Sequence, residues 1–314
     1  MYDKIRKSVF PLFAALIWGV AFVAQTNNTA GAFTFNAMRA VIAFIFLIPV
    51  VLIFTKGDVK HLFCEKEKKN TKALWIGGVL CGVALSFATY LQQLGIDNGT
   101  EAGKASFLTA MYIVIVPIIG MFFKKKVPLT VWISAIIAVG GLYLLCIKSD
   151  FSVRPSDILV VACSFVFACH IMIIDKATSM CNGIKLSCIQ FLTMAVVSSV
   201  CAFIFETPKL TDFTSNVLPI LYLGVCSSGI AYTLQILAQK DANPTVTTLL
   251  LSMESVFGVI AGAIGNGEIM IAQEYIGCAL MLVAVVLAQI PIEVLKKPFI
   301  KSKKEEYTED KTSE

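Results

Sequence analysis

Two charged residues interrupt long apolar stretches of the chain, and both could take part in binding chemistry. Glu254 lies in the stretch Leu251-Ser252-Met253-Glu254-Ser255, and Arg39 lies near the start of another apolar stretch. A charged side chain at the centre of a bilayer costs about 2.5–3.5 kcal/mol on insertion scales unless it faces water or a partner. We interpret Glu254 as a site for an ammonium group, a cation or a coupling proton. We interpret Arg39 as a site for a substrate carboxylate.

Each of these residues also has a purely structural interpretation. Glu254 could be tied to neighbouring Ser or Thr hydroxyls or kept protonated, and Arg39 could extend towards the interface or cap backbone carbonyls. His170 lies inside an apolar stretch and is open to both interpretations, because a lone histidine commonly packs with a satisfied hydrogen bond. The remaining candidates for substrate binding or coupling are polar or aromatic residues of the spans, namely Asn36, Gln190 and Trp18.

One segment of the chain occurs twice. Residues 82–120 and 224–262 align without a gap at an offset of 142 and share ten identities in 39 positions, including Tyr90/Tyr232 and Gln93/Gln235. Unrelated apolar stretches would share roughly 8% of positions. We interpret these two pairs as hydrogen-bonding layers of an outer and an inner gate, with simple packing of the repeats as the alternative. Both charges lie where the repeat is asymmetric, because Glu254 aligns with Tyr112 and Arg39 aligns approximately with Thr193.

Membrane-spanning helices must position these residues. Hydrophobic residues make up 57% of the chain, charged residues make up 15%, and the mean hydropathy is +0.79, which is outside the range of soluble globular proteins. A helix rises about 1.5 Å per residue, so about 20 apolar residues cross a hydrocarbon layer of about 30 Å. The sequence predicts an all-α membrane protein with ten such spans, at approximately residues 8–26, 34–54, 73–94, 102–123, 129–147, 156–175, 186–205, 216–238, 244–265 and 272–292.

The ten spans divide into two units of five, and each unit carries one copy of the repeat at the same place. We expect a first five-helix repeat over residues 1–150, a second over 151–295, and a disordered cytoplasmic tail over 296–314. Because five is odd, the second repeat is inverted in the bilayer relative to the first. Inverted repeats are typical of transporters that open to each side of a membrane in turn. Pro117 predicts a kink in the fourth span, which makes the fourth and ninth spans candidates for deformable elements.

Lys and Arg are distributed unevenly over the connections between the spans. With the N-terminus inside, the cytoplasmic segments hold 21 of these residues and the external segments hold four. The positive-inside rule therefore predicts that both termini are cytoplasmic. The net charge of +5 reflects this bias, so we expect no nucleic-acid partner. The expected partners are the lipid bilayer, a small-molecule substrate, and a coupling proton or counter-substrate.

Several short motifs occur in the order and spacing of a known family. They are Leu16-Ile17-Trp18-Gly19-Val20-Ala21-Phe22, Asn36 to Arg39, and Ser252 to Val256 followed by Gly267-Glu268. Over about residues 8–292 the chain resembles the EamA family of drug/metabolite transporters. The resemblance implies two inverted five-helix repeats, a central cavity lined by spans one to four and six to nine, and transport of amino acids or related metabolites, often outward. The chain departs from the family at Ser255, where Pro is common, and at Lys124 to Lys126, where a Gly-Glu pair is frequent.

Catalysis and metal chemistry have no visible apparatus in the sequence. The motif His-Glu-x-x-His is absent, and His61 and His170 are the only two histidines, so we expect no metal site and no cofactor. We therefore expect a permease rather than an enzyme: a secondary active transporter that works by alternating access in a bacterial plasma membrane. The alternatives are a non-transporting receptor or scaffold and an intramembrane enzyme.

Overall fold

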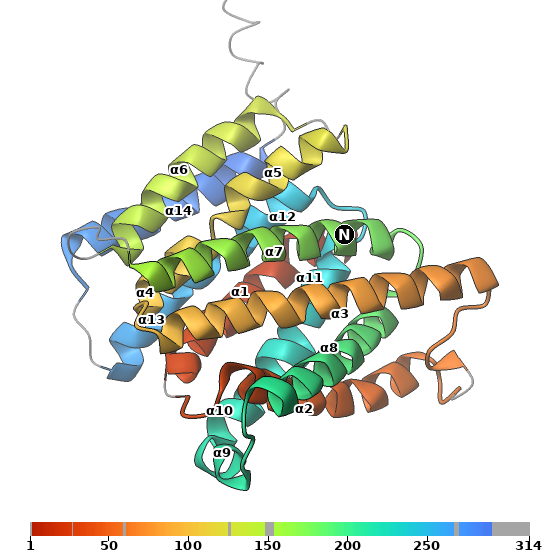
Figure 1. Ribbon diagram of the computed structural model, residues 1–314. Helices are drawn as coiled ribbons and strands as arrows, with labels where there is room; N and C mark the ends of the chain where they lie inside the picture. The colour runs from red at the N-terminus through yellow and green to blue at the C-terminus, as the bar shows by residue number, and fades with distance from the viewer. Residues whose placement is uncertain are drawn as a thin grey trace, which may run out of the picture.

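The chain folds into a bundle of helices (Figure 1). The computed structural model describes residues 2–26, 28–58, 61–124, 127–147, 154–266 and 270–290. Within these residues, ten helical segments are long and apolar enough to cross a membrane. The structure thus confirms the predicted all-α membrane fold. The boundary between the two predicted repeats, Gly267-Glu268 and the tail 296–314 lie outside the described residues.

The first half of the chain contributes five spans. They are α1 (Tyr2–Thr26), α2 (Ala32–Phe54), α3 (Lys68–Asp97), the pair α4 (Ala102–Thr109) and α5 (Tyr112–Phe122), and α6 (Leu129–Cys146). Helix α3 is longer than the predicted span 73–94, because residues 68–72 at its start and 95–97 at its end continue the helix beyond the apolar stretch.

The second half repeats this order. Its spans are α7 (Pro155–Thr178), α8 (Gly183–Phe205), the run α10 (Val217–Leu221), η2 (Tyr222–Ala231) and α11 (Tyr232–Gln239), the pair α12 (Pro244–Leu251) and α13 (Met253–Asn266), and α14 (Ala272–Gln289). The short helix α9 (Leu210–Ser215) lies between the seventh and eighth spans. The segment η2 is a π-helix, which is wider than an α-helix.

The packing of the two halves has a twofold pattern. Helix α6 packs on α14 and α2 packs on α8, so each of these helices meets its own counterpart. Helix α3 packs on α7 and α8, and in the same way η2 packs on α1 and α2. In Figure 1, the pair α6 and α14 lies at one edge of the bundle and the pair α2 and α8 at the opposite edge. An exchange of halves preserves these contacts, as expected for inverted repeats with an odd number of spans.

Glycines permit the closest helix crossings and reveal which residues are true counterparts. A Cβ atom at Gly82 would lie 2.5 Å from the carbonyl oxygen of Gln190, and a Cβ atom at Gly224 would lie 3.2 Å from the carbonyl oxygen of Arg39. Because Gly82 and Gly224 are equivalent at the offset of 142, Gln190 is the structural counterpart of Arg39. The approximate alignment of Arg39 with Thr193 is wrong by three residues: in the second and seventh spans the counterparts lie 151 positions apart, and Thr193 corresponds to Ile42.

Two carboxylates cap helices across the pair α2 and α8. Glu206 follows the end of α8 and accepts hydrogen bonds from the backbone N–H groups of Phe33 (2.9 Å) and Thr34 (2.8 Å) at the start of α2. Glu65 follows α2 and accepts from the backbone N–H of Asn182 (2.9 Å) at the start of α8. Free N–H groups at a helix N-terminus favour an anion. Each cap therefore fixes the position of the partner helix.

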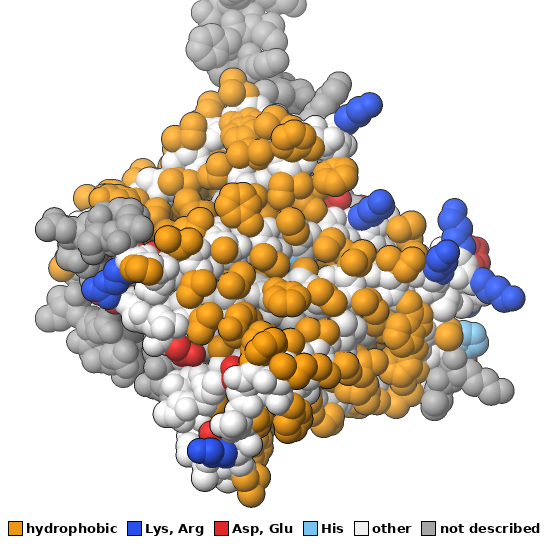
Figure 2. Space-filling model, in the orientation of Figure 1, with side chains coloured by type: hydrophobic (Ala, Val, Ile, Leu, Met, Phe, Trp, Pro, Cys, Tyr) orange, Lys and Arg blue, Asp and Glu red, His pale blue; other side chains and the backbone are white. Residues whose placement is uncertain are grey.

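The outer surface of the bundle is apolar. Side chains such as Ile45, Ile136, Phe203 and Leu282 are more than half exposed and project from the spanning helices. Figure 2 shows a broad hydrophobic surface over the helices, with Lys and Arg side chains gathered near its edges. A surface of this kind is stable only in a lipid environment, so the protein is an integral membrane protein.

Candidate functional site

The fourth and ninth spans are interrupted at equivalent positions. Helix α4 ends at Thr109 and α5 begins at Tyr112, whereas α12 ends at Leu251 and α13 begins at Met253. Helices α4 and α12 are both eight residues long, and their bounds differ by the repeat offset of 142. Interrupted helices at membrane depth expose backbone and side-chain polar groups that a continuous helix would hide. These breaks place Tyr112 and Glu254 directly after the two interruptions.

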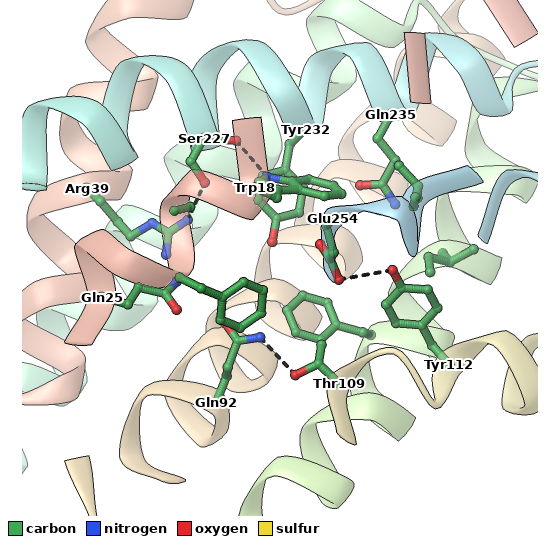
Figure 3. A pocket seen from close by; sticks show the side chains of 15 residues that line it. Trp18, Gln25, Arg39, Gln92, Thr109, Tyr112, Ser227, Tyr232, Gln235 and Glu254 are labelled. Carbon is green, nitrogen blue, oxygen red and sulfur yellow. Dashed lines mark hydrogen bonds between the residues drawn. The ribbon is translucent and has the colours of Figure 1, made fainter. Parts of the chain in front are cut away.

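A small cavity lies beside the two breaks (Figure 3). Its volume is about 50 Å³, which has room for a few water molecules. Spans one to four, six, eight and nine line it, in agreement with the resemblance except that the seventh span, α8, contributes no lining residue. The lining residues are Trp18, Ala21, Phe22, Gln25, Arg39, Gln92, Thr109, Tyr112, Phe167, Ile171, Ser227, Tyr232, Gln235, Leu251 and Glu254.

Arg39 forms one polar wall of the cavity. Its side chain is almost fully buried, and it donates from Nε to Ser228 Oγ (3.1 Å) and from Nη2 to Ser227 Oγ (3.2 Å). Both serines belong to the π-helix η2, and the equivalent segment of the first half lies within the α-helix α3. Within the described residues, no acidic side chain lies within ion-pair distance of Arg39. The guanidinium is therefore held by neutral hydroxyls that an anion could replace.

Glu254 lines the same cavity from the ninth span. Its carboxylate is buried and accepts a long hydrogen bond from the Tyr112 hydroxyl (3.3 Å). The neighbouring serines bond elsewhere: Ser252 donates to Leu249 O, and Ser255 pairs with Ser106. The carboxylate is thus tied to its own repeat counterpart, and not to an adjacent hydroxyl as the structural interpretation proposed.

Amides complete the polar lining. Gln92 Nε2 donates to Thr109 Oγ1 (3.1 Å), and the amide oxygens of Gln25 and Gln235 are buried with no hydrogen-bond partner. A buried amide oxygen without a partner is costly, so these two groups are suited to receive a donor from a bound molecule. Gln25, Gln92 and Thr109 were absent from the predicted site, although the two glutamines show the same signal as Arg39, a polar side chain within an apolar span.

The aromatic ring of Tyr232 separates the cavity from a buried polar pair, His170 and Gln190. Tyr232 packs against Trp18 (ring centroids 4.7 Å apart) on one side and edge-on against His170 (6.0 Å) on the other. His170 Nε2 bonds Gln190 Oε1 (2.8 Å), and both residues are fully buried. His170 and Gln190 therefore lie behind Tyr232 and do not line the cavity.

Other predicted residues also lie away from the cavity. Asn36 is buried in α2, and its Nδ2 has no partner. Tyr90 stacks on Phe33 (3.7 Å) near the start of α2. Gln93 donates to Gln25 O (3.3 Å), so it contacts a cavity residue through the backbone without lining the cavity. The two members of the predicted tyrosine gate thus occupy unequal surroundings.

Basic side chains close the bundle on the side where α1 begins, here called the N-terminal side. Arg6 Nη1 donates to Leu237 O (2.7 Å), and Lys7 Nζ donates to Asp241 O (2.5 Å). These bonds join the start of α1 to the end of α11 and the loop that follows it. We call them the N-side latch. Gln239 reinforces it by donating to Ile171 O (3.1 Å) in α7.

An equivalent latch closes the opposite side. Arg154, directly before α7, donates from Nη1 to Gly99 O (2.8 Å) in the loop between α3 and α4. Gly99 and Asp241 are equivalent at the offset of 142, and both have a left-handed backbone, with φ of 96° and 58°. Asp157 adds bonds to Thr100 and Lys104 on this side. We call this set the opposite-side latch. The two latches are formed together, one on each side of the bundle.

The chain matches a known family over almost all of the described helices. Residues 7–147 and residues 154–289 each match the model of the EamA-like transporter family. The chain belongs to the EamA-like transporter family. The repeated match places one family unit on each of the two five-span sets, as the packing of the helices does.

Individual relatives agree with this membership. An "Uncharacterized transporter" of Archaeoglobus fulgidus is 28% identical over 282 residues, which cover 88% of this EamA-like chain and 84% of the relative. A solved chain described as "Crystal structure of protein" superimposes with a TM-score of 0.75 at 15% identity, and covers 90% of this chain and 96% of its own. The second likeness supports the fold alone. The EamA-like protein is therefore a transporter, and the described part of its chain holds ten helices that can span a membrane.

The site of this EamA-like transporter is suited to binding. Within the described part of the chain, no cluster of three or more His, Cys, Asp or Glu side chains could hold a metal ion. The cavity instead offers a cation at Arg39, a carboxylate at Glu254, and the amide oxygens of Gln25 and Gln235. Such a lining can bind a small molecule that carries both charges.

Proposed function

We propose that this EamA-like transporter is a secondary active transporter that moves a small zwitterionic, amino-acid-like metabolite by alternating access. The observation that supports the proposal is that Arg39 and Glu254 line one cavity, each held by neutral hydroxyls. A buried charge without a charged partner is costly, and a substrate group of opposite charge would offset that cost.

The chemistry of each wall suggests how such a substrate would bind. A substrate carboxylate would take the place of Ser227 and Ser228 on the Arg39 guanidinium, which binds carboxylates through two parallel hydrogen bonds. A substrate ammonium group would approach Glu254 and the amide oxygens of Gln25 and Gln235. In the absence of cargo, Glu254 would instead carry a coupling proton, with a counter-substrate as the alternative.

The cavity, at about 50 Å³, leaves little room for such a molecule, so we propose that the helices separate to admit it. The two latches supply equivalent points of separation, one on each side. We propose that substrate entry breaks one latch while the other stays formed. In this scheme Gln93, with Tyr90 behind it, belongs to the gate on the opposite side. Tyr232, Gln235 and Gln239 belong to the gate on the N-terminal side.

The bias of Lys and Arg supports a direction for this scheme. With the N-terminus inside, the sequence assigns 21 Lys and Arg residues to the cytoplasmic segments and four to the external segments, so we propose that the N-terminal side is cytoplasmic. We further propose a bacterial plasma membrane location, rocking of the halves 1–150 and 151–295 against each other, and export of the substrate. The export direction rests on the family resemblance.

The test is exchange in proteoliposomes loaded with an equimolar mixture of the 20 common amino acids. Efflux of each is followed by mass spectrometry with and without an imposed pH gradient. We expect selective efflux of one or a few amino acids by the wild-type protein and its loss in Arg39→Gln and Glu254→Gln. Lys66→Gln and Glu101→Gln are matched controls, because both residues are exposed and lie outside the cavity. Unaltered efflux in both cavity variants would refute the assignment of the site.

A further inference from the structure

A second and larger hollow lies on the outside of the bundle. It is a groove of about 910 Å³ between α3, α5 and α7. Each helix lines it with one stripe: α3 with Lys69, Lys72, Ile76 and Leu80, and α7 with Cys169, Met172 and Lys176. Residues spaced by three or four positions share one face of a helix. Both helices therefore turn a continuous face to the groove, and Phe123 at the end of α5 borders it.

The base of the groove is a tight helix crossing. A Cβ atom at Gly77 would lie 2.7 Å from Ala177 Cβ, so α3 and α7 touch there through small residues. Larger side chains on both helices, such as Leu80 and Met172, form the walls of the groove on either side of this crossing. Ile76 and Leu80 are each half exposed, and they face the membrane layer because they lie within a spanning helix.

The dimensions of the groove match one leaflet of a bilayer. Its stripe on α3 runs over 12 residues from Lys69 to Leu80, and the 11 steps between them span about 16 Å at a rise of about 1.5 Å per residue. Half of a hydrocarbon core of about 30 Å is about 15 Å. An acyl chain of one leaflet would therefore extend along the groove from the interface to the bilayer centre.

The charges of the groove lie at one end. Lys69 and Lys72 are in the first two turns of α3 and Lys176 is in the last turn of α7, and all three are exposed on the N-terminal side. Asp175 and Asp241 also border this end, so three cations face two carboxylates. Figure 2 shows Lys and Arg side chains gathered where α3 begins, beside the hydrophobic surface. Beyond this charged end, the groove is lined by apolar side chains such as Ile76, Leu80 and Met172.

We propose that this groove is a binding site for an anionic phospholipid of the leaflet on the N-terminal side. Its phosphate would lie among Lys69, Lys72 and Lys176, and one acyl chain would lie against Ile76, Leu80 and Met172. Helices α3 and α5 belong to the first half of the chain and α7 to the second, so the lipid would bridge the two halves. The proposal is independent of the substrate assigned to the central cavity.

The test is native mass spectrometry of the purified full-length protein with dioleoyl phosphatidylglycerol, and with dioleoyl phosphatidylcholine as the zwitterionic lipid of identical chains. We expect the anionic lipid to bind at least about tenfold more tightly, since each lysine at the surface contributes a severalfold gain. The triple variant Lys69→Gln/Lys72→Gln/Lys176→Gln should lose this preference. The control Lys56→Gln/Lys66→Gln/Lys68→Gln changes the net charge equally on the same side, outside the groove, and should keep it.

A second pair of variants keeps the charge constant. Cys169→Phe fills the groove, and Ile45→Phe enlarges a lipid-facing side chain of α2 elsewhere. We expect Cys169→Phe to weaken binding of the anionic lipid at least fivefold and Ile45→Phe to leave it unchanged. The proposal is overturned if the anionic lipid binds within twofold of the zwitterionic lipid, if both triple variants behave alike, or if Cys169→Phe binds like the wild-type protein.

Discussion

The two latches predict opposite responses to equivalent mutations. Arg6→Gln/Lys7→Gln removes both basic donors of the N-side latch, and Arg154→Gln removes the equivalent donor of the opposite-side latch. If each latch holds its own side closed, the double variant should open the N-terminal side and Arg154→Gln should open the other. The contacts of each donor determine how large these effects are.

The N-side latch should have the larger effect. Arg6 is 6% exposed and its hydrogen bond to Leu237 O is short, and a hydrogen bond to a charged group contributes about 1.5–3 kcal/mol. The exposed bond of Lys7 adds about 0.5 kcal/mol at most. Loss of about 2 kcal/mol changes the ratio of open to closed forms about 30-fold. Arg154 bonds at an exposed position, so about 0.5–1 kcal/mol and a two- to fivefold change are expected there.

Accessibility of a cysteine in the cavity measures this ratio. Ala21 lines the cavity and is 3% exposed, so Ala21→Cys is a small change in a background in which the ten native cysteines are replaced by Ala or Ser. A membrane-impermeant maleimide is added to either face of sealed vesicles. The double variant should be labelled about 30-fold faster from the N-terminal side and more slowly from the other. Lys66→Gln is the control, because Lys66 is exposed and lies outside both latches.

The reasoning fails under two clear results. If both latch variants accelerate labelling from the same side, the latches do not act on opposite gates. If neither variant changes labelling by more than twofold, the latch bonds do not hold the cavity closed.

Three further predictions concern stability and can be read from thermal unfolding in detergent. Gly277→Ala should lower the free energy of unfolding by about 2 kcal/mol, because the new Cβ would lie 2.8 Å from Gly141 O. Gly140→Ala, whose Cβ would meet open space, should be neutral or slightly stabilising. Equal effects of the two variants would contradict the α6–α14 crossing. Glu206→Gln should lower the free energy of unfolding by about 1–2 kcal/mol, because it weakens the cap of α2. The control Glu101→Gln should leave the stability unchanged. A Glu206→Gln protein as stable as the wild type would contradict the capping of α2 by Glu206. Arg39→Met should leave the melting temperature unchanged or raise it, because an apolar side chain of similar length avoids a buried charge. A large drop in melting temperature would mean that Arg39 stabilises the folded structure.

The sequence was sufficient to predict the framework of the protein. Composition and span length predict ten membrane helices because a bilayer imposes one length and one polarity on every span. The cost of charge at membrane depth also singled out Arg39 and Glu254, and both line the cavity. The prediction of ten spans is confirmed because it depends on the solvent, which acts on every residue of a span alike.

The remaining features depend on packing between helices. The fourth span is interrupted at residues 110–111, whereas Pro117 lies six residues further on, inside helix α5. The spans are apolar on most faces, so hydropathy could not tell that Gln92 faces the cavity while His170 lies behind Tyr232. The π-helix that presents Ser227 and Ser228 to Arg39 likewise has no local sequence signal, since its repeat counterpart is α-helical.

The most direct test of the central claim is binding to the cavity itself. Equilibrium binding of an isotope-labelled mixture of the 20 common amino acids to the purified protein, read by mass spectrometry, should show saturable retention of one or a few of them. Arg39→Met, with an unchanged melting temperature, should abolish that retention, because only the guanidinium matches the substrate carboxylate. Retention of the same amino acids by Arg39→Met at wild-type affinity would contradict the account.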